Sequence, residues 1–108
     1  MLDTLPMNYR NQPEFAANSA RAAQMLMSAR LQCNLRHQDV AAATRRIARQ
    51  LGPAFAISTY RLADIESGRV RPTMWRLSSL CAVYGIEMSQ VLQWYGVQHA
   101  GLASATAA

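Results

Sequence analysis

The sequence contains no lysine, few histidines and cysteines, and no glycine-rich phosphate loop. Neither Cys33 nor Cys81 belongs to a Cys-x-x-Cys pair, and His37 and His99 are far apart. No cluster of carboxylates and no spacing typical of metal ligands is present. A catalytic centre needs a convergent set of polar groups, so we expect a protein that is not an enzyme and that uses no cofactor or metal.

Long hydrophobic runs are also missing. No apolar run approaches the roughly 18 residues that span a bilayer, and the N-terminus lacks the apolar core of a signal peptide. We therefore expect a cytoplasmic protein with no membrane partner, and nothing indicates a small-molecule ligand. Both cysteines stand in apolar helical contexts, which predicts two buried, reduced thiols.

The charge that is present is regional. All eleven basic residues are arginines, and ten of them fall between positions 21 and 76, against only three acids, which leaves +7 there. The remainder carries one arginine and three acids, or −2. A basic region on a small domain is the footprint expected of a phosphate-backbone partner, because neutralising phosphates releases counterions. Codon bias toward arginine explains the same composition, so charge alone does not decide.

Length and periodicity predict one all-α domain. The chain has 108 residues, of which 51% are hydrophobic, enough for a single helical core. Apolar spacing and capping residues indicate five helices and no strand. The expected helices run from Asn18 or Ser19 to Cys33, from Arg36 to Leu51, from the N-cap Ser58 to Gly68, from the N-cap Thr73 to Gly85, and from Met88 to Tyr95. Residues 1–17 are expected to form an arm, 18–96 the domain, and 97–108 a flexible tail.

The second of these helices is the longest stretch of clear amphipathic pattern. Its inward stripe is expected to hold Val40, Thr44, Ile47 and Leu51. Its remaining arginines, Arg45, Arg46 and Arg49, point away from that stripe. They either follow a nucleic-acid backbone or simply keep a helix face solvated.

The most informative stretch follows the connector at residues 54–57. A short capped helix with inward Leu62 and Ile65 leads into Ile-Glu-x-Gly at 65–68, a basic loop, and Pro-Thr at 72–73. A helix with Leu-x-x-Leu spacing comes next, at Leu77 and Leu80. This series resembles the lambda-repressor-like helix-turn-helix family, also called the XRE or Cro/CI type.

The resemblance covers about residues 22–96 and implies a five-helix DNA-binding domain. Upstream, Arg30 and the pair Val40-Ala41 match family positions in the first two helices. In this family the helix that begins at Ser58 is the recognition helix, whose first turn enters the major groove of double-stranded DNA. The implied function is sequence-specific DNA binding by a bacterial transcriptional regulator, most often a repressor.

Site residues follow from the resemblance position by position. The base-facing positions are Thr59, Tyr60, Ala63 and Asp64. The backbone-contacting positions are His37, Ser67, Arg69 and Arg71, to which we add Arg61 for its charge and location. The positions of Arg30 and Glu66 pair across the first and third helices of the family, which predicts a partly buried structural ion pair.

Two features depart from the family pattern. Residues 41–57 separate Val40 from Ser58 by about two extra helical turns and a longer connector. A bacterial subgroup of the family has a similarly lengthened second helix and a Leu-x-x-Tyr-Gly ending, which residues 92–96 resemble. Asp64 brings a carboxylate toward DNA, which repels phosphate unless it pairs with Arg61 or reads cytosine.

These departures leave a second function open. The alternative is a protein-interaction module of the same fold with weak or lost DNA binding, which Asp64 and the insertion favour. The family often acts on paired half-sites, so a homodimer also stays open, with no surface fixed by the sequence.

Overall fold

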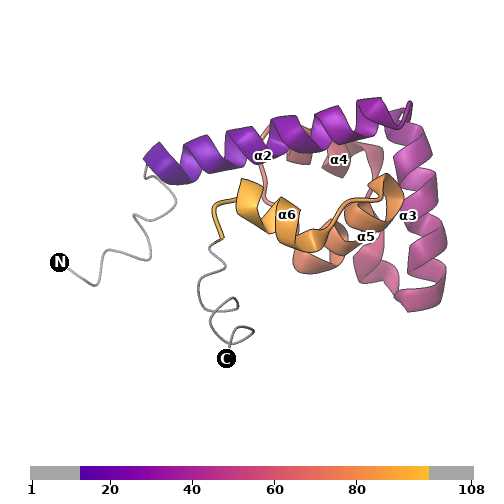
Figure 1. The fold of residues 1–108 in the computed structure, drawn as a ribbon. Coiled ribbons are helices and arrows are strands. Elements are labelled where there is room, and N and C mark those ends of the chain that lie inside the picture. The colour runs from indigo at the N-terminus through magenta and orange to yellow at the C-terminus, as the bar shows by residue number, and fades with distance from the viewer. Residues whose placement is uncertain (1–12, 98–108) are drawn as a thin grey trace.

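The computed structural model describes residues 13–97, which form five α-helices, one 3₁₀ helix and no strand (Figure 1). In chain order the elements are α2 (Pro13–Gln32), α3 (His37–Leu51), η3 (Pro53–Phe55), α4 (Thr59–Glu66), α5 (Met74–Tyr84) and α6 (Met88–Trp94). The all-α fold class predicted from the sequence is confirmed. Within this range, no helix is long and apolar enough to cross a membrane.

Helix α2 begins at Pro13, five residues before the first start expected from the sequence. Proline is favoured in the first turn of a helix, because its fixed φ suits the helix and its missing N–H would be unpaired there anyway. Alanines at 16 and 17 then continue the helix well. The last five residues of the expected arm therefore belong to α2, and residues 1–12 and 98–108 lie outside the described range.

The other helix ends follow the capping residues that the sequence suggests. Asn34 adopts a φ of 58°, the left-handed conformation that stops α2 from continuing. The hydroxyls of Ser58 and Thr73 accept hydrogen bonds from backbone N–H groups in the first turns of α4 and α5, at 3.0 and 3.2 Å. Gly85, with a φ of 70°, ends α5 in the left-handed conformation, which glycine adopts without strain.

One hydrophobic core joins all five α-helices. Helix α2 crosses the top of the molecule in Figure 1 and packs against α4 and α6, while α3 runs down the right-hand side and packs against α4 and α5. The fully buried core side chains include Leu26, Val40, Ile57, Leu62, Ile65, Leu80 and Val91.

Two predictions of burial are wrong. Leu51 is 62% exposed, because it ends α3 at the point where the chain turns into η3 and leaves the core. Cys33 is exposed as well, since α2 stops at Gln32 and the cysteine no longer follows the helical face. Its thiol donates a hydrogen bond to the carbonyl oxygen of Tyr84 at 3.8 Å. Cys81 is buried as predicted, and burial raises the pKa of its thiol.

The insertion forms an ordered part of the fold. The Thr44 hydroxyl accepts a hydrogen bond from the N–H of Ile57 at 3.0 Å and lies 3.3 Å from the Ile57 carbonyl oxygen. From α5, Ser79 donates to the carbonyl of Phe55 at 2.7 Å, and the Arg76 guanidinium donates to that of Ala56 at 3.1 Å. Side chains of α3 and α5 thus fix the connector from both sides.

Candidate nucleic-acid interface

Helix α4 has one buried face and one open face. Leu62 and Ile65 are fully buried and anchor the helix in the core. Thr59, Tyr60 and Ala63 lie on the open face, and the Tyr60 side chain is 84% exposed. Arg61 is exposed too, so the insertion does not cover the leading turn of α4.

The carboxylate of Asp64 has a cationic neighbour, but not the one considered from the sequence. Arg69 Nη1 lies 3.7 Å from Asp64 Oδ1, whereas Arg61 forms no ion pair among the residues with described side chains, 17–97. Ser67 donates its hydroxyl to the backbone carbonyl of Asp64 at 3.0 Å. Ser67 and Arg69 are both exposed at the end of α4. The family resemblance predicts that both contact the DNA backbone.

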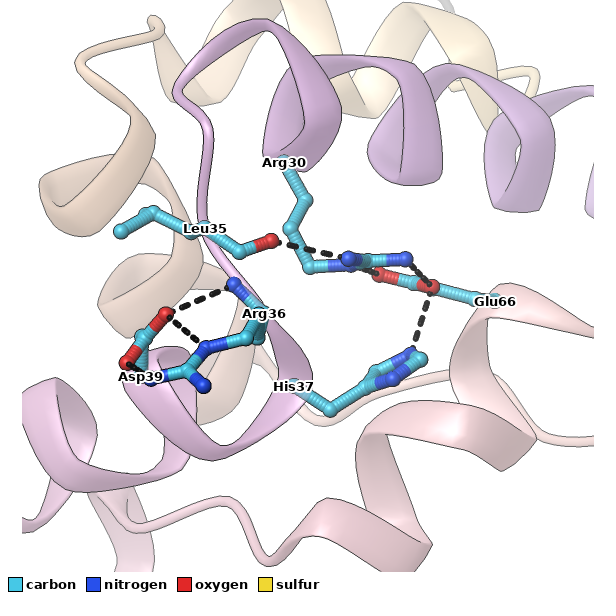
Figure 2. Close-up of polar contacts among 6 residues, drawn as sticks. All are labelled: Arg30, Leu35, Arg36, His37, Asp39 and Glu66. Atoms are coloured by element: carbon cyan, nitrogen blue, oxygen red, sulfur yellow. Dashed lines mark hydrogen bonds and ion pairs between the residues drawn. The ribbon is translucent and has the colours of Figure 1, made fainter.

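Glu66 joins α4 to the first two described helices (Figure 2). Arg30 donates two hydrogen bonds to its carboxylate, from Nε at 2.7 Å and from Nη2 at 3.0 Å. The Arg30 and Glu66 side chains are only 8% and 5% exposed, so they form the buried ion pair expected from the sequence. The hydrogen bond to Glu66 raises the pKa of Arg30 against the opposing effect of burial. A third bond, to the carbonyl of Leu35 at 2.9 Å, also fixes the guanidinium against the turn after α2.

His37 is part of the same cluster. Its Nε2 lies 3.0 Å from Glu66 Oε1, and Figure 2 shows its ring approaching the carboxylate from the side opposite Arg30. The family resemblance predicts that His37 contacts the DNA backbone, but its Nε2 already contacts Glu66 within the protein. The side chain remains 42% exposed, so only its outer edge is open to a partner.

Helix α3 begins without the serine or threonine that usually caps a helix. Instead, Asp39 accepts hydrogen bonds from the backbone N–H of Arg36 at 2.8 Å and from its guanidinium at 3.2 Å (Figure 2). The Arg36 guanidinium thereby lowers the pKa of Asp39. The Asp39 carboxylate, at the third position of the helix, supplies one of the two hydrogen bonds of a capping box. Arg36 can therefore stand at the N-cap, where a hydroxyl residue is more common.

The guanidinium group of Arg71 makes contacts within the protein. Its Nη2 donates to the carbonyl of Tyr95 at 2.8 Å, and its Nε to the hydroxyl of Ser19 at 3.3 Å. Its guanidinium carbon also lies 5.1 Å from the centre of the Tyr95 ring, within the range of a cation–π contact. These bonds connect the loop before α5 to the end of α6 and to α2, and they favour a structural role for Arg71. The contact of Arg71 with the DNA backbone that the resemblance implies stays a prediction.

The arginines of the central region fall into two sets. Those whose guanidinium groups bond within the protein are Arg30, Arg36, Arg69, Arg71 and Arg76. The others are exposed, and their guanidinium groups form no hydrogen bond or ion pair with residues 17–97, whose side chains are described: Arg21, Arg45, Arg46, Arg49 and Arg61. All of the second set except Arg21 lie on the latter half of α3 and the first turn of α4. The unpaired positive charge of the described residues is concentrated there.

The described residues hold no group of three or more His, Cys, Asp and Glu side chains that could bind a metal ion. Comparisons with models of protein families, with curated proteins and with solved structures found no match for this chain.

Proposed function

We propose that this protein is a sequence-specific regulator of transcription, similar to the lambda-repressor-like family, that inserts α4 into the major groove of double-stranded DNA. The observation that carries the proposal is the exposed leading turn of α4, residues 59–61, on a helix whose other face is fixed in the core by Leu62 and Ile65. A short, capped and firmly anchored helix is the shape that the major groove admits.

The exposed side chains of α4 suit base edges. The hydroxyls of Thr59 and Tyr60 can donate and accept hydrogen bonds, and the methyl groups of Thr59 and Ala63 can contact thymine. Asp64 accepts from cytosine N4, and the neighbouring charge of Arg69 offsets its repulsion of phosphate. Arg61 and Arg69, with the hydroxyl of Ser67 and the outer edge of His37, then border the helix as contacts to the backbone.

The protein-interaction module is favoured by a different observation. Met74 and Trp75, in the first turn of α5, are 54% and 56% exposed, and large exposed apolar side chains often mark protein contacts. Both features that supported this alternative from the sequence are weaker in the structure, since Asp64 has a cation beside it and the insertion leaves α4 open.

Titration of the protein with random duplex and with duplexes selected from a random pool, at several salt concentrations, tests the proposal. We expect affinity to fall steeply as salt rises, and Arg61→Gln to make the slope of log K against log salt shallower by roughly 0.9, the value for one lost phosphate contact. Thr59→Ala should weaken binding to selected duplexes more than to random duplex. Arg21→Gln, an exposed change on α2, is the matched control.

Binding that does not respond to salt, or no binding at low ionic strength, contradicts the proposal and leaves the interaction module ahead. Equal losses on selected and random duplexes in Thr59→Ala would remove α4 from base recognition. Selected duplexes also reveal whether recognition uses one half-site or two, which bears on a dimer.

A further inference from the structure

A groove with two arginines at its rim lies between α3 and η3. It has a volume of about 270 Å³ and is lined by Arg45, Ala48, Arg49, Pro53 and Ala56. Arg45 and Arg49 are four residues apart on α3, so both guanidinium groups reach from the same side of the helix. The groove therefore combines two cationic side chains with an apolar floor.

The groove is held in a fixed shape. Its far wall is η3, whose flanking carbonyl oxygens accept hydrogen bonds from Ser79 and Arg76 of α5. Its near wall is α3, which is joined to the end of the connector by Thr44 and Ile57. A ligand would find this site already formed, so binding would need little ordering of the chain.

The groove lies close to the start of the recognition helix along the chain. Ala56 forms part of its wall, and Ser58, the N-cap of α4, follows two residues later. On the opposite wall, Arg45 follows Thr44, whose hydroxyl bonds to the N–H of Ile57 at 3.0 Å. Arg45 thus directly follows the residue of α3 that holds the connector just before α4, and Arg49 lies about one turn farther along α3.

Neither arginine has a competing partner in the part of the chain whose side chains the structure describes. Among the residues with described side chains, 17–97, none donates to, accepts from or forms an ion pair with either guanidinium group. Both side chains are exposed. A guanidinium group matches phosphate oxygens with its fixed pair of donors, and an apolar floor suits the face of a deoxyribose.

We infer that this groove binds the sugar-phosphate backbone of the same duplex that α4 reads, next to the bases under its leading turn. The inference rests on the proposed function and extends it: the insertion adds a second backbone site beside the recognition helix. Arg45 and Arg49 contact successive phosphates, and the sugar between them lies over Pro53 and the two alanines.

The test compares Arg45→Gln with Arg49→Gln in one protein, the single variants, and Arg46→Gln as a matched control. Arg46 is exposed on the same helix and carries the same charge, but it does not line the groove. We expect the double variant to make the salt slope shallower by roughly 1.8 and to bind on the order of 50-fold more weakly at 0.1 M salt. Arg46→Gln should keep the wild-type slope, and base preference in selection should not change.

Ethylation interference on the selected duplex with wild-type protein gives a second readout that does not depend on variant folding. We expect interference at phosphates beside the bases protected by α4, and its absence at those phosphates would contradict the inference. Inorganic phosphate alone, monitored at the arginine side chains by NMR, distinguishes an isolated anion site from a backbone site: saturation by free phosphate with no effect on duplex binding would overturn the inference.

The same measurements distinguish a failure of this inference from a failure of the proposed function. If wild-type protein binds duplex with the expected Thr59 dependence but the double variant keeps the wild-type slope, or Arg46→Gln loses as much as Arg45→Gln, the groove is not a backbone site and the function stands. If wild-type protein shows no salt-sensitive duplex binding, both are overturned.

Discussion

At the scale of single residues, Glu66 connects three helices through one buried carboxylate. A carboxylate that is 5% exposed is costly to bury unless its oxygens are fully engaged, and here one oxygen accepts from Arg30 and the other from both Arg30 and His37. These bonds join α4, α2 and α3 at one point. Glu66 therefore fixes the end of the recognition helix, while the residues beside it are left for a partner.

We predict that Arg30 and Glu66 are energetically coupled. Arg30→Ala leaves a buried carboxylate that only His37 still contacts, and it should destabilise the protein by about 3 kcal/mol. The double variant, which lacks both charges, should lose less than the sum of the single variants, with a coupling of roughly 1–3 kcal/mol. Chemical denaturation of wild-type protein, the variants Arg30→Ala and Glu66→Ala, and the double variant measures this coupling. Additive losses would mean that the two charges act independently.

At the scale of elements, the lengthened α3 and its connector form one unit. The extra turns of α3 do not extend into solvent alone, because the chain returns along them through η3. The rings of Phe55 and Trp75 also meet at 5.4 Å between centroids, which packs η3 on the first turn of α5. The insertion therefore adds a second layer beside α4 rather than a loose loop.

We predict that the Thr44 hydroxyl holds this unit together. Thr44→Val keeps the shape of the side chain but leaves the buried N–H of Ile57 without its acceptor, which should cost about 1–3 kcal/mol. Thr44→Ser keeps the hydroxyl and is the matched control. Amide hydrogen exchange should speed up at Ile57 in Thr44→Val and stay slow in Thr44→Ser. Equal protection at Ile57 in the two variants would show that another group stabilises the connector.

Much of this element structure is predictable from the sequence, because it depends on local chemistry. Hydroxyls at Ser58 and Thr73 cap helices, and Asn34 and Gly85 end them, each through contacts within a few residues. The start of α2 and the exposure of Leu51 were not predictable in this way. Helix propensity at residues 13–17 is weak evidence until a core supports the helix, and burial of Leu51 depends on where the chain goes after α3.

At the scale of the whole molecule, the net charge is +5, and the central arginines divide into those that bond within the protein and those that are exposed and unpaired among the described residues. Half of the central arginines bond to carbonyls, hydroxyls or carboxylates of the protein itself. The rest, except Arg21, lie on the latter half of α3 and the first turn of α4. Counting arginines along the sequence could not reveal this division. The partners of Arg71 and Arg76 come from elements 20 or more residues away.

Arg71 tests that division directly. We predict that Arg71→Gln lowers the free energy of unfolding by roughly 1–2 kcal/mol, because the charged hydrogen bonds from its guanidinium to Tyr95 and Ser19 are lost from a partly exposed site. The salt slope of duplex binding should stay at the wild-type value, in contrast to Arg61→Gln, for which the opposite pattern is expected. Denaturation and salt titration on the same two proteins check this, and a shallower slope for Arg71→Gln would instead support its contact with the backbone.

The part of the candidate site on α4 could be predicted from a sequence motif, but the part formed by the insertion could not. Thr59, Tyr60 and Ala63 stand on the open face that the spacing of Leu62 and Ile65 dictates. The groove formed by Arg45, Arg49 and Pro53 depends on how η3 folds back on α3, which no local pattern encodes. The nearest signal was three unpaired arginines within an insertion.

The bonds from Thr44, Arg76 and Ser79 to the connector should also protect it from proteolysis. Proteases cut chains that can be drawn out into an extended strand, and long insertions between helices are their usual targets. Residues 52–57 cannot be drawn out without breaking contacts to two helices. Limited digestion of the native protein should therefore spare this connector, and the insertion should survive inside a cell as well as the helices around it.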